Sequence, residues 1–238
     1  MDKELIESLI SGAEKLCLEI NTAQAEKMLD FMEAVINRNR VMNLTSVIEP
    51  KQFVETHIID SLTPLPFIPE SASVMDVGTG AGFPGIILKI AREDISLTLL
   101  DSTGKKLDFI REASSALAID VAEFVHRRAE EASHEPEYRE KYDITIARAV
   151  AVLPVLCEYC LPFVKLGGSF IAMKGRDISA EKASAEKTIS VLGAGKPGIE
   201  RLILPYSASE RNLIIYPKEH PTPGKYPRAN AVLRKLAR

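Results

Sequence analysis

The chain has few cysteines, no excess of basic charge and no long uninterrupted apolar run. Three cysteines among 238 residues are too few for the disulfide framework of a small secreted protein. A formal net charge of −3 does not suggest a general nucleic-acid binder, although a net value says nothing about local patches. The N-terminus MDKELIES lacks the apolar core of a signal peptide, and the apolar stretch 149–168 is interrupted by Glu158 and two prolines. We therefore expect a cytoplasmic protein with reduced thiols and no membrane segment.

The residues that are present indicate an ordinary globular protein with two regimes along the chain. Apolar residues make up 46% and charged residues 26% of the sequence, which is enough to bury a sizeable core. Residues 1–64 show helical periodicity only. Thr22 is expected to cap the second of three helices, and Pro50 suits the first turn of the third. Three prolines in TPLPFIPES then break the pattern, so we expect an N-terminal helical extension over 1–64 packed on a second domain over 65–238.

From residue 65, short runs rich in β-branched residues alternate with helical segments. The expected strands are 73–77, 96–101, 121–127, 142–148 and 168–174, followed by a hairpin around 202–204 and 213–216. The expected helices are 85–92, 105–118, 129–141, 153–165 and 180–192. This alternation implies a parallel sheet covered on both faces, with right-handed crossovers. The hairpin adds an antiparallel strand at or near one edge, so the predicted fold class is α/β, with a Rossmann-like, mostly parallel seven-stranded sheet.

The first expected strand runs into a loop that contains four glycines in eight residues. The loop reads DVGTGAGFPG and carries the pattern Gly-x-Gly-x-x-Gly at Gly80, Gly82 and Gly85. Between a strand and a helix, such glycines let the backbone turn tightly and let a ligand approach the main chain. Open α/β sheets bind ligands at this turn. The loop therefore predicts a cofactor site, and a merely structural turn is the less favoured interpretation.

The glycines alone do not distinguish a dinucleotide from S-adenosylmethionine. Asp101 ends the second strand at the spacing of an acid that accepts hydrogen bonds from ribose hydroxyls, and both cofactors carry such a ribose. Asp76 lies just before the loop, where a carboxylate can order the turn and favour a cationic ligand but is poorly placed beside a pyrophosphate. No tyrosine stands four residues before a lysine, and a helical N-terminal extension leaves little material for a dehydrogenase substrate domain. These features favour S-adenosylmethionine.

A set of motifs occurs in the order seen in one known family and spans nearly the whole chain. The motifs are NLTSV at 43–47, HIIDSL at 57–62, DVGTGAGFPGIILKI at 76–90, LLDSTGKK at 99–106, RRAEE at 127–131, RAVAVLPVLCEYCLPFVKLGG at 148–168 and AMKG at 172–175. The chain resembles the glucose-inhibited division protein B family, whose members methylate 16S ribosomal RNA to form 7-methylguanosine. It departs from the family pattern after YPR at 226–228, where the usual Gly-x-Pro continuation is absent.

The resemblance implies a class I S-adenosylmethionine-dependent methyltransferase fold with S-adenosylmethionine as cofactor. It implies a guanosine of 16S ribosomal RNA as the target, in free RNA or in the small ribosomal subunit, and no obligate protein partner. Its glycine-loop contacts fall on Gly78, Thr79, Gly80, Gly82 and Phe83, of which the first and last match contacts to the methionine part. Its ribose-side contacts fall on Asp101, Ser102 and Thr103. Its adenine-side contacts fall on Ala129 and Glu130, and Arg148 matches an arginine beside the reacting end.

Transfer of a methyl group to the seventh ring nitrogen of guanine needs no general base. This nitrogen carries a lone pair and no proton, so positioning is expected to supply the catalysis, and no single catalytic acid or base is expected. Arg148 and Lys174, at adjacent strand ends, are the candidates for positioning. A guanidinium bound bidentately to guanine would block the reacting nitrogen, so Arg148 is expected to orient the cofactor carboxylate or a phosphate.

Local basic clusters predict contacts to RNA phosphates. The candidates for RNA binding are His57, Arg127, Lys174 and Arg228, and the residues after 218 form a basic tail. The target base is expected to be splayed out or unpaired, because the edge of a stacked base is hard to reach. His57 and Asp60, one helical turn apart, are also a candidate dyad.

Two other functions stay open at this stage. One is an NAD(P)-dependent oxidoreductase, which the glycine pattern alone allows. The other is a non-catalytic RNA- or cofactor-binding module, because no acid or base stands out. Cys157 and Cys160 form Cys-x-x-Cys within an expected helix without a second pair, so we expect buried free thiols and no metal site.

Overall fold

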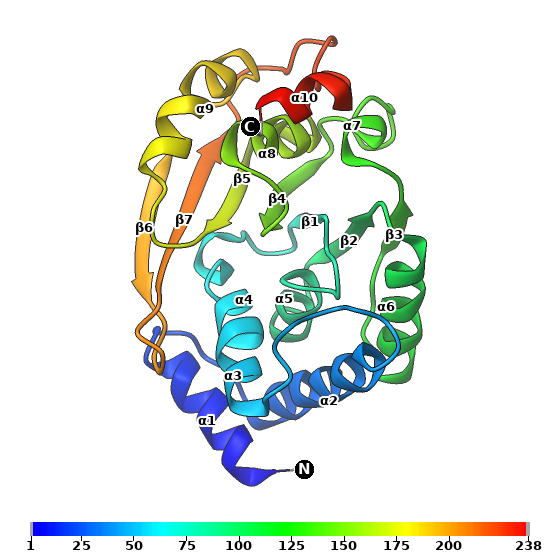
Figure 1. The fold of residues 1–238 in the computed structure, drawn as a ribbon, viewed down its shortest axis with the longest axis vertical. Coiled ribbons are helices and arrows are strands. Elements are labelled where there is room, and N and C mark those ends of the chain that lie inside the picture. The colour runs from blue at the N-terminus through cyan, green and yellow to red at the C-terminus, as the bar shows by residue number, and fades with distance from the viewer. Residues whose placement is uncertain (1, 237–238) are drawn as a thin grey trace.

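The computed structural model describes residues 2–236, within which seven strands form one sheet (Figure 1). The strands are β1 (Ser73–Val77), β2 (Ser96–Asp101), β3 (Glu123–His126), β4 (Tyr142–Arg148), β5 (Val164–Lys174), β6 (Gly198–Ile203) and β7 (Glu210–Pro217). Their order across the sheet is β3-β2-β1-β4-β5-β7-β6. The first five are parallel to one another, and β7 is antiparallel to both β5 and β6. The predicted α/β class is confirmed, and the reversed strand lies next to the edge.

Helices cover both faces of this sheet. Those before it are α1 (Lys3–Glu14), α2 (Thr22–Asn39), α3 (Pro50–Phe53), the π-helix η1 (Val54–Ile59), α4 (Asp60–Leu62) and the 3-10 helix η2 (Leu65–Phe67). Those after β1 are α5 (Gly85–Ala91), α6 (Gly104–Ala116), α7 (Ala129–Ala132), α8 (Leu153–Cys160), the 3-10 helix η3 (Leu161–Phe163), α9 (Ser179–Val191) and α10 (Asn230–Leu236). Over residues 2–236, no helix combines the length and the apolar content needed to cross a membrane.

Alternate residues of the central strands contact two separate apolar clusters. In β1, Val74 belongs to the cluster that includes α2, α5 and α6, whereas Met75 and Val77 belong to the cluster that includes α7, α8 and α9. Successive side chains of a strand point to opposite faces of its sheet. The two clusters are therefore the two faces, and each is covered by its own helices, as the strand–helix alternation predicts.

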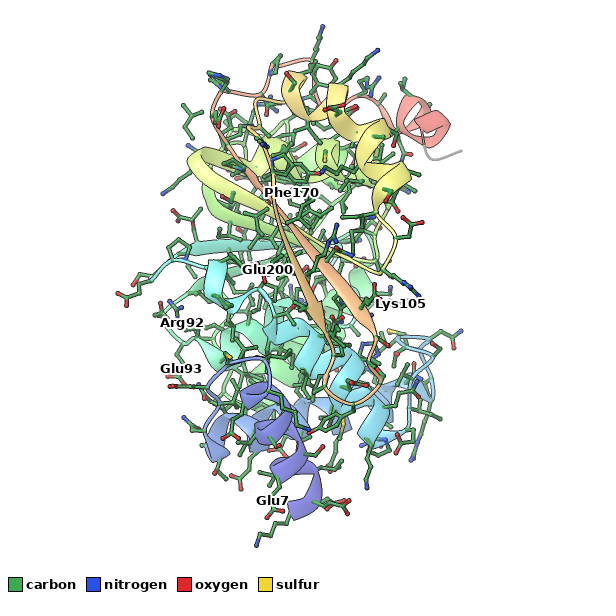
Figure 2. All side chains as sticks on the ribbon, turned by 90° about the vertical axis from the view of Figure 1, so that its left-hand side faces the viewer. Glu7, Arg92, Glu93, Lys105, Phe170 and Glu200 are labelled. Atoms are coloured by element: carbon green, nitrogen blue, oxygen red, sulfur yellow. The ribbon has the colours of Figure 1, made fainter. Side chains whose placement is uncertain are left out.

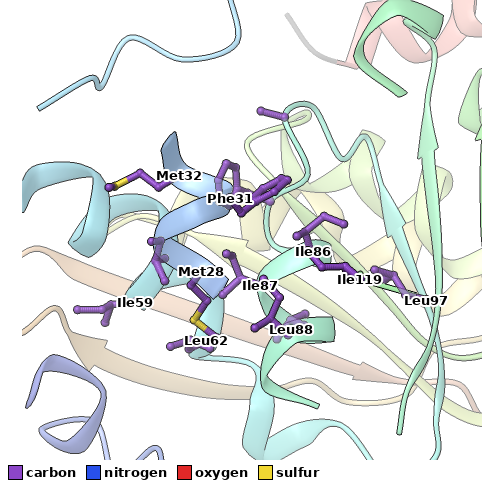
Figure 3. Packing of buried hydrophobic residues seen from close by; sticks show 14 of the residues in the cluster. Met28, Phe31, Met32, Ile59, Leu62, Ile86, Ile87, Leu88, Leu97 and Ile119 are labelled. Atoms are coloured by element: carbon purple, nitrogen blue, oxygen red, sulfur yellow. The ribbon is translucent and has the colours of Figure 1, made fainter. Parts of the chain in front are cut away.

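The N-terminal helices share the first cluster with the sheet. Met28 and Phe31 of α2 are fully buried in the same cluster as Ile86 and Ile87 of α5 (Figure 3). The ring of Phe31 also meets that of Phe83 edge-on, with 5.6 Å between centroids. The helical extension thus packs directly against the loop and helix that follow β1, while the division of the chain after residue 64 stays a prediction.

The cap of α2 differs from the one expected. Thr22 is the first helical residue, and Asn21 is the N-cap: its side chain accepts a hydrogen bond from the Gln24 N–H at 2.9 Å. The Gln24 side chain in turn accepts one from the Asn21 N–H at 3.0 Å. This reciprocal pair satisfies two N–H groups that a helix start otherwise leaves unpaired.

Two helices are shorter than their apolar patterns indicated. The helix expected over 129–141 ends at Ala132, shortly before Pro136, which disfavours helical backbone at the preceding residue. The helix expected over 153–165 ends at Cys160, because Pro162 has no N–H to donate. A single 3-10 turn follows, and β5 begins at Val164.

The turn between β6 and β7 reaches the N-terminal helices (Figure 2). The backbone N–H groups of Tyr206 and Ser207 donate to Oε1 of Glu55 at 2.6 and 2.7 Å. Glu55 belongs to η1 and is only 4% exposed. The far end of the hairpin is therefore bound to the helix that leads into the sheet.

Candidate functional site

A cavity of about 760 Å³ opens at the carboxyl ends of β1, β2 and β4. The strand order reverses between β1 and β4, which is where open α/β sheets bind their ligands. Its walls come from the β1–α5 loop, the segment after β2, the start of α7, the end of β4 and the N-terminal helices. The cavity thus collects loops that are far apart in the sequence.

The β1–α5 loop needs glycine for its backbone conformation and its packing. Gly78 has φ of +75°, and a Cβ there would lie 2.7 Å from Val150 Cγ2. A Cβ on Gly85 would lie 2.6 Å from Leu99 Cδ2 and 2.9 Å from Asp76 Oδ2. The loop therefore turns tightly with its main chain exposed to the cavity, as the glycine pattern predicts.

Asp76 orders this loop from beneath. Its Oδ2 accepts hydrogen bonds from Thr79 Oγ1 at 2.7 Å and from the Gly85 N–H at 2.9 Å. The carboxyl group is fully buried, and burial raises its pKa to about 6, although the two hydrogen bonds lower it in part. Asp76 orders the turn, as expected. It is not among the residues lining the cavity, so it does not contact a ligand there directly.

Asp101, at the end of β2, joins the loop to the next turn. Oδ2 accepts from the Gly80 N–H at 2.9 Å, and Oδ1 accepts from the Thr103 N–H at 2.8 Å. The carboxylate lines the cavity while only 7% of the residue is exposed. Each carboxylate oxygen has a second lone pair, so Asp101 can still accept hydrogen bonds from hydroxyl groups of a ligand.

Aromatic rings from the β1–α5 loop and from η1 form one wall of the cavity. The imidazole of His57 stacks on Phe83 with 5.2 Å between centroids and 21° between planes. The Arg148 guanidinium lies 5.7 Å from the centroid of the same ring. Burial, followed by the charge of Arg148, lowers the pKa of His57 to about 4, so the imidazole is neutral at physiological pH. Its Nε2 is 2.7 Å from Thr45 Oγ1.

Asp60 bridges two arginines at the edge of the cavity. Its Oδ2 is 2.9 Å from Nη1 of Arg148, and its Oδ1 is 3.0 Å from Nε of Arg211. Asp60 is almost fully buried, while both arginines line the cavity. The predicted dyad of His57 and Asp60 is wrong: the aspartate pairs with arginines from β4 and β7, and the histidine with a threonine hydroxyl.

Lys174 acts on the segment that follows β4. Its Nζ donates to the carbonyl of Ala151 at 2.8 Å and to Glu181 Oε2 at 2.7 Å. The same Glu181 oxygen accepts from the Leu153 N–H at 2.7 Å. The three groups fix residues 149–153, which include the cavity-lining Ala149 and Val150.

The structure brings most of the sequence-predicted site residues to this one cavity. Those that line it are His57, Gly78, Thr79, Gly80, Phe83, Asp101, Ser102, Thr103, Arg127, Ala129, Glu130, Arg148 and Lys174. Gly82 does not; a Cβ there would lie 2.9 Å from the ring of Phe31, so this glycine serves the packing of α2. Arg228 does not either, because its guanidinium binds the buried carboxylate of Glu158. The end of the basic tail, residues 237–238, lies outside the described residues.

Sequence reasoning missed several lining residues. Arg211 belongs to the β6–β7 hairpin, and no motif surrounds it in the sequence. Val150 also lines the cavity, and the residue before it, Ala149, has a left-handed backbone with φ of +57°. Thr45 was part of the NLTSV motif but had no assigned role. Asn39 accepts from the N–H groups of Leu44 and Thr45 and so holds this segment over the cavity.

The lining carries more basic than acidic side chains. The basic residues are Lys106, Arg127, Arg128, Arg148, Lys174 and Arg211. The acidic residues are Asp60, Asp101 and Glu130. The cavity is therefore suited to a ligand that carries phosphate groups, despite the net negative charge of the chain.

Cys157 and Cys160 are buried in α8 as free thiols, as expected. Among residues 2–236, no three histidine, cysteine, aspartate or glutamate side chains are placed together to hold a metal ion.

Comparisons with known proteins agree on one family. A family model described as GidB, rRNA small subunit methyltransferase G, matches residues 24–211. The ribosomal RNA small subunit methyltransferase G of Alkaliphilus oremlandii is 43% identical over 227 residues, which cover 94% of this chain and 95% of that protein. Its namesake from Pelotomaculum thermopropionicum is 41% identical, with 97% and 98% covered.

Solved structures show the same fold at low sequence identity. An O-methyltransferase from Bacillus cereus, solved in complex with SAH, superposes with a TM-score of 0.57 at 15% identity, covering 90% of this chain and all of that one. An SAM-dependent O-methyltransferase from Thermotoga maritima gives 0.51 at 12% identity, covering 78% and 72%. These neighbours establish the Rossmann-like methyltransferase fold, and the near full-length relatives establish the family. The chain belongs to the GidB family, the rRNA small subunit methyltransferases G.

Proposed function

We propose that this protein transfers the methyl group of S-adenosylmethionine to the seventh ring nitrogen of a guanosine in 16S ribosomal RNA. The observation that carries the proposal is one cavity at the switch point of a methyltransferase fold. It joins the glycine loop and the acidic end of β2 to a basic rim, which consists of Arg127 and Arg128. Membership of the family supports RNA of the small ribosomal subunit as the substrate class.

The residues around the cavity fit the parts of the cofactor. Asp101 has free lone pairs for the ribose hydroxyls, beside Ser102 and Thr103. Ala129 and Glu130 lie on the wall at the start of α7, where they suit the adenine. The remaining glycine-loop residues and Phe83 suit the methionine part; those that line the cavity are Gly78, Thr79 and Gly80. Gly82 supports the loop from its packed side.

The chemistry needs orientation more than proton transfer. Bound S-adenosylmethionine supplies a methyl carbon already activated by its sulfonium. In such a transfer the guanine nitrogen would form the new bond with its own lone pair while the carbon–sulfur bond would break with its electrons on sulfur, so no residue of this chain would have to remove a proton. Accordingly, the histidine at the cavity is held neutral and stacked on Phe83. We assign His57 and Phe83 to shaping the pocket rather than to acid–base catalysis.

Arg148 is the candidate for positioning at the reacting end. Asp60 and the Thr56 carbonyl both bind its Nη1, at 2.9 and 3.2 Å, and His57 Nδ1 lies 3.5 Å from its Nη2. The guanidinium is thus held in place, and its Nε and the second N–H of Nη2 can address a carboxylate or a phosphate. Lys174 has two of its three donors engaged. We therefore assign Lys174 chiefly to holding the wall after β4, with one N–H left for the RNA.

The RNA backbone is assigned to the basic rim. Arg127 is half exposed, with its Nε 3.1 Å from Glu135, and Arg128 stands beside it. His57, as a neutral group beneath the rim, can contact a base but not attract a phosphate. Arg228 is bound to Glu158 inside the molecule, so we no longer assign it to RNA.

Methylation of small ribosomal subunits that lack the modification tests the proposal. Purified protein with labelled S-adenosylmethionine should label one guanosine of 16S ribosomal RNA, in subunits or in naked RNA, and borohydride–aniline cleavage should locate a 7-methylguanosine. Label in another base or at another ring atom would overturn the nitrogen assignment. Binding of S-adenosylhomocysteine without any transfer would favour a non-catalytic module instead.

The oxidoreductase alternative is not favoured, since the relatives are methyltransferases by name. Calorimetric titration checks this separately: S-adenosylhomocysteine should bind, and NADH should not.

A further inference from the structure

The C-terminal segment is bound to the core beside the cofactor side of the cavity. In Figure 1, α10 lies next to α7 and α8. Arg139 donates to the carbonyls of Thr222 and Tyr226 at 2.8 and 3.0 Å. Arg228 donates its backbone N–H and its Nε to Glu158 at 2.9 and 2.8 Å. Because Glu158 is fully buried, this pair fixes the segment before α10 begins.

Asn230, the first residue of α10, reaches a residue of the cavity wall. Its Nδ2 donates to Oε1 of Glu130 at 2.6 Å. Glu130 lines the main cavity and also a second hollow of about 650 Å³ between α7 and the C-terminal segment. Helix α7 spans only Ala129–Ala132. A helix of one turn has little stability of its own, so the contact from α10 decides where the Glu130 carboxylate stands.

We infer that Asn230 is a positioning residue for the adenosine end of the cofactor, acting through Glu130. The inference rests on the proposed function, because it takes the cofactor to be S-adenosylmethionine with its adenine beside Ala129 and Glu130. The amide of Asn230 occupies Oε1, which leaves Oε2 to accept a hydrogen bond from the adenine amine or a ribose hydroxyl. The C-terminal segment therefore serves cofactor affinity, and contact with RNA is not its main role.

The charges of the segment agree with this role. The guanidinium of Arg228 is paired with the buried carboxylate of Glu158. Lys225 and Arg228 both lie over the ring of Tyr226, at 5.6 and 5.7 Å from its centroid. The contact of the segment with Glu130 of α7 is made by the neutral amide of Asn230.

The test is the affinity for S-adenosylhomocysteine, measured by calorimetry on the full chain. Asn230→Ala should weaken binding about 5- to 10-fold, because an unheld carboxylate must be ordered by the ligand itself. Asn230→Asp should weaken it further, because a second carboxylate would repel that of Glu130. Val232→Ala, on the exposed side of the same helix, is the matched control and should bind like wild type.

A double-mutant cycle shows whether the effect passes through Glu130. In a Glu130→Gln background, Asn230→Ala should change the affinity by less than about twofold, because the charge-assisted contact is already gone. In steady-state assays, Asn230→Ala should raise KM for S-adenosylmethionine and leave kcat within about twofold. Asn230→Gln, which keeps the amide, should recover part of the affinity.

Three results would overturn the inference. The first is an affinity for S-adenosylhomocysteine within twofold of wild type in both Asn230→Ala and Asn230→Asp. The second is a loss of affinity on Asn230→Ala that is as large in the Glu130→Gln background as in wild type. The third is an increase in KM for the RNA with no increase in KM for S-adenosylmethionine. The last would assign the segment to RNA instead. A wild-type protein that does not bind S-adenosylhomocysteine would refute the proposed function itself, so the two failures are distinguishable. Melting curves without ligand keep a folding defect apart from a binding defect.

Discussion

A single residue beneath the cavity can have two structural tasks, and Gly85 is the sharpest case. Its N–H binds Asp76, while its missing side chain lets Leu99 and Asp76 approach. One methyl group therefore disturbs both the turn and the acid that orders it.

Gly85→Ala should destabilise the protein by about 1–3 kcal/mol, as overpacking of a tight core does. It should also weaken cofactor binding, because the loop must move to admit the methyl group. Urea unfolding and calorimetry measure the two effects. Gly198→Ala, where a Cβ meets nothing within 4 Å, should change stability by less than about 1 kcal/mol; equal losses at both positions would contradict the steric explanation.

His57 makes stability depend on pH. Its pKa of about 4 in the folded state lies below the ordinary 6.5, so the unfolded chain binds more protons between these values. The contribution of the neutral His57 to the free energy of unfolding is therefore fully present above pH 6.5 and is lost as the pH falls towards 4. From pH 7.5 to 5 the contribution is about 2 kcal/mol.

Urea unfolding of wild type and His57→Gln at pH 7.5 and 5 isolates this contribution. The wild type should lose about 2 kcal/mol more than the variant over this range. The raised pKa of Asp76 acts in the opposite direction, but both proteins contain it, so it cancels in the difference. Parallel losses in the two proteins would show that the histidine does not titrate as expected.

Asp60 holds two arginines with one carboxylate, so its loss leaves two cationic groups without their partner. Asp60→Asn should destabilise the protein by about 3 kcal/mol, as breaking a buried ion pair does, and should lower kcat strongly because Arg148 is no longer held. Asp108→Asn is the control, since its pair with Arg111 is exposed, and it should cost less than about 1 kcal/mol. Methyl transfer at the wild-type rate in Asp60→Asn would remove this group from the positioning machinery.

At the scale of elements, the β6–β7 turn and η1 depend on each other through Glu55. A buried carboxylate that accepts two backbone N–H groups leaves both without a partner when it is removed. Glu55→Ala should therefore cost about 2–3 kcal/mol in urea unfolding. Glu7→Ala, whose pair with Lys3 is exposed, should cost less than about 1 kcal/mol. Since η1 also carries His57, kcat should fall in Glu55→Ala but not in Glu7→Ala.

The sequence was a good guide to elements with a strong local signal. The bounds predicted for β1, β2 and β4 agree with the structure, because buried parallel strands are apolar runs between clear breaks. It was a poor guide where two signals compete, as in the stretch after Leu153, where apolar residues favour a helix and Pro162 ends it. The π-turn had no visible signal, since its pattern of buried residues is close to that of an α-helix.

The site was predictable to the same extent. The glycine loop and Asp101 have a local pattern and a fixed spacing, so they could be found from the sequence. The pairing of Asp60 with Arg211 joins residues 151 positions apart, and no local pattern indicates it. The pairing of Arg228 with the buried Glu158 could not be foreseen either, because a basic residue in a basic tail looks the same in the sequence whether it faces solvent or a buried glutamate.

At the scale of the whole molecule, cofactor binding and folding are linked. The cavity is built from both the N-terminal helices and the sheet, so a ligand that binds there stabilises both parts. S-adenosylhomocysteine at 100 times its Kd should add about 2.7 kcal/mol and raise Tm by roughly 5–10 °C. NADH at the same concentration should leave Tm unchanged. A shift confined to one of two separate transitions would show that the extension and the sheet unfold independently.

RNA binding should depend on salt through the rim and not through Arg228. The logarithm of affinity falls with the logarithm of salt in proportion to the number of phosphate contacts. Arg128→Ala should therefore reduce this slope by about 1, whereas Arg228→Ala should leave it unchanged while lowering stability. Filter binding of 16S RNA fragments between 50 and 200 mM salt measures the slope. Truncating the chain after Pro221 would not distinguish a role of the tail in RNA binding from a role in stability, because it removes Arg228 and leaves Glu158 buried without that partner.

The π-turn at Val54–Ile59 sets the rotational phase of the helix that contains it. Successive residues of an α-helix are separated by about 100° around its axis, and a π-turn inserts one residue without adding a full turn. Deleting a single residue between Phe53 and Asp60 would let the helix close into regular α geometry. The two ends would then keep nearly the same phase, whereas regular α geometry over the full number of residues would rotate them relative to each other by about 100°, so that Phe53 could stay in the core only if Asp60 turned away from Arg148. The irregular turn is thus what allows one short helix to serve the apolar interior and the charged rim at the same time.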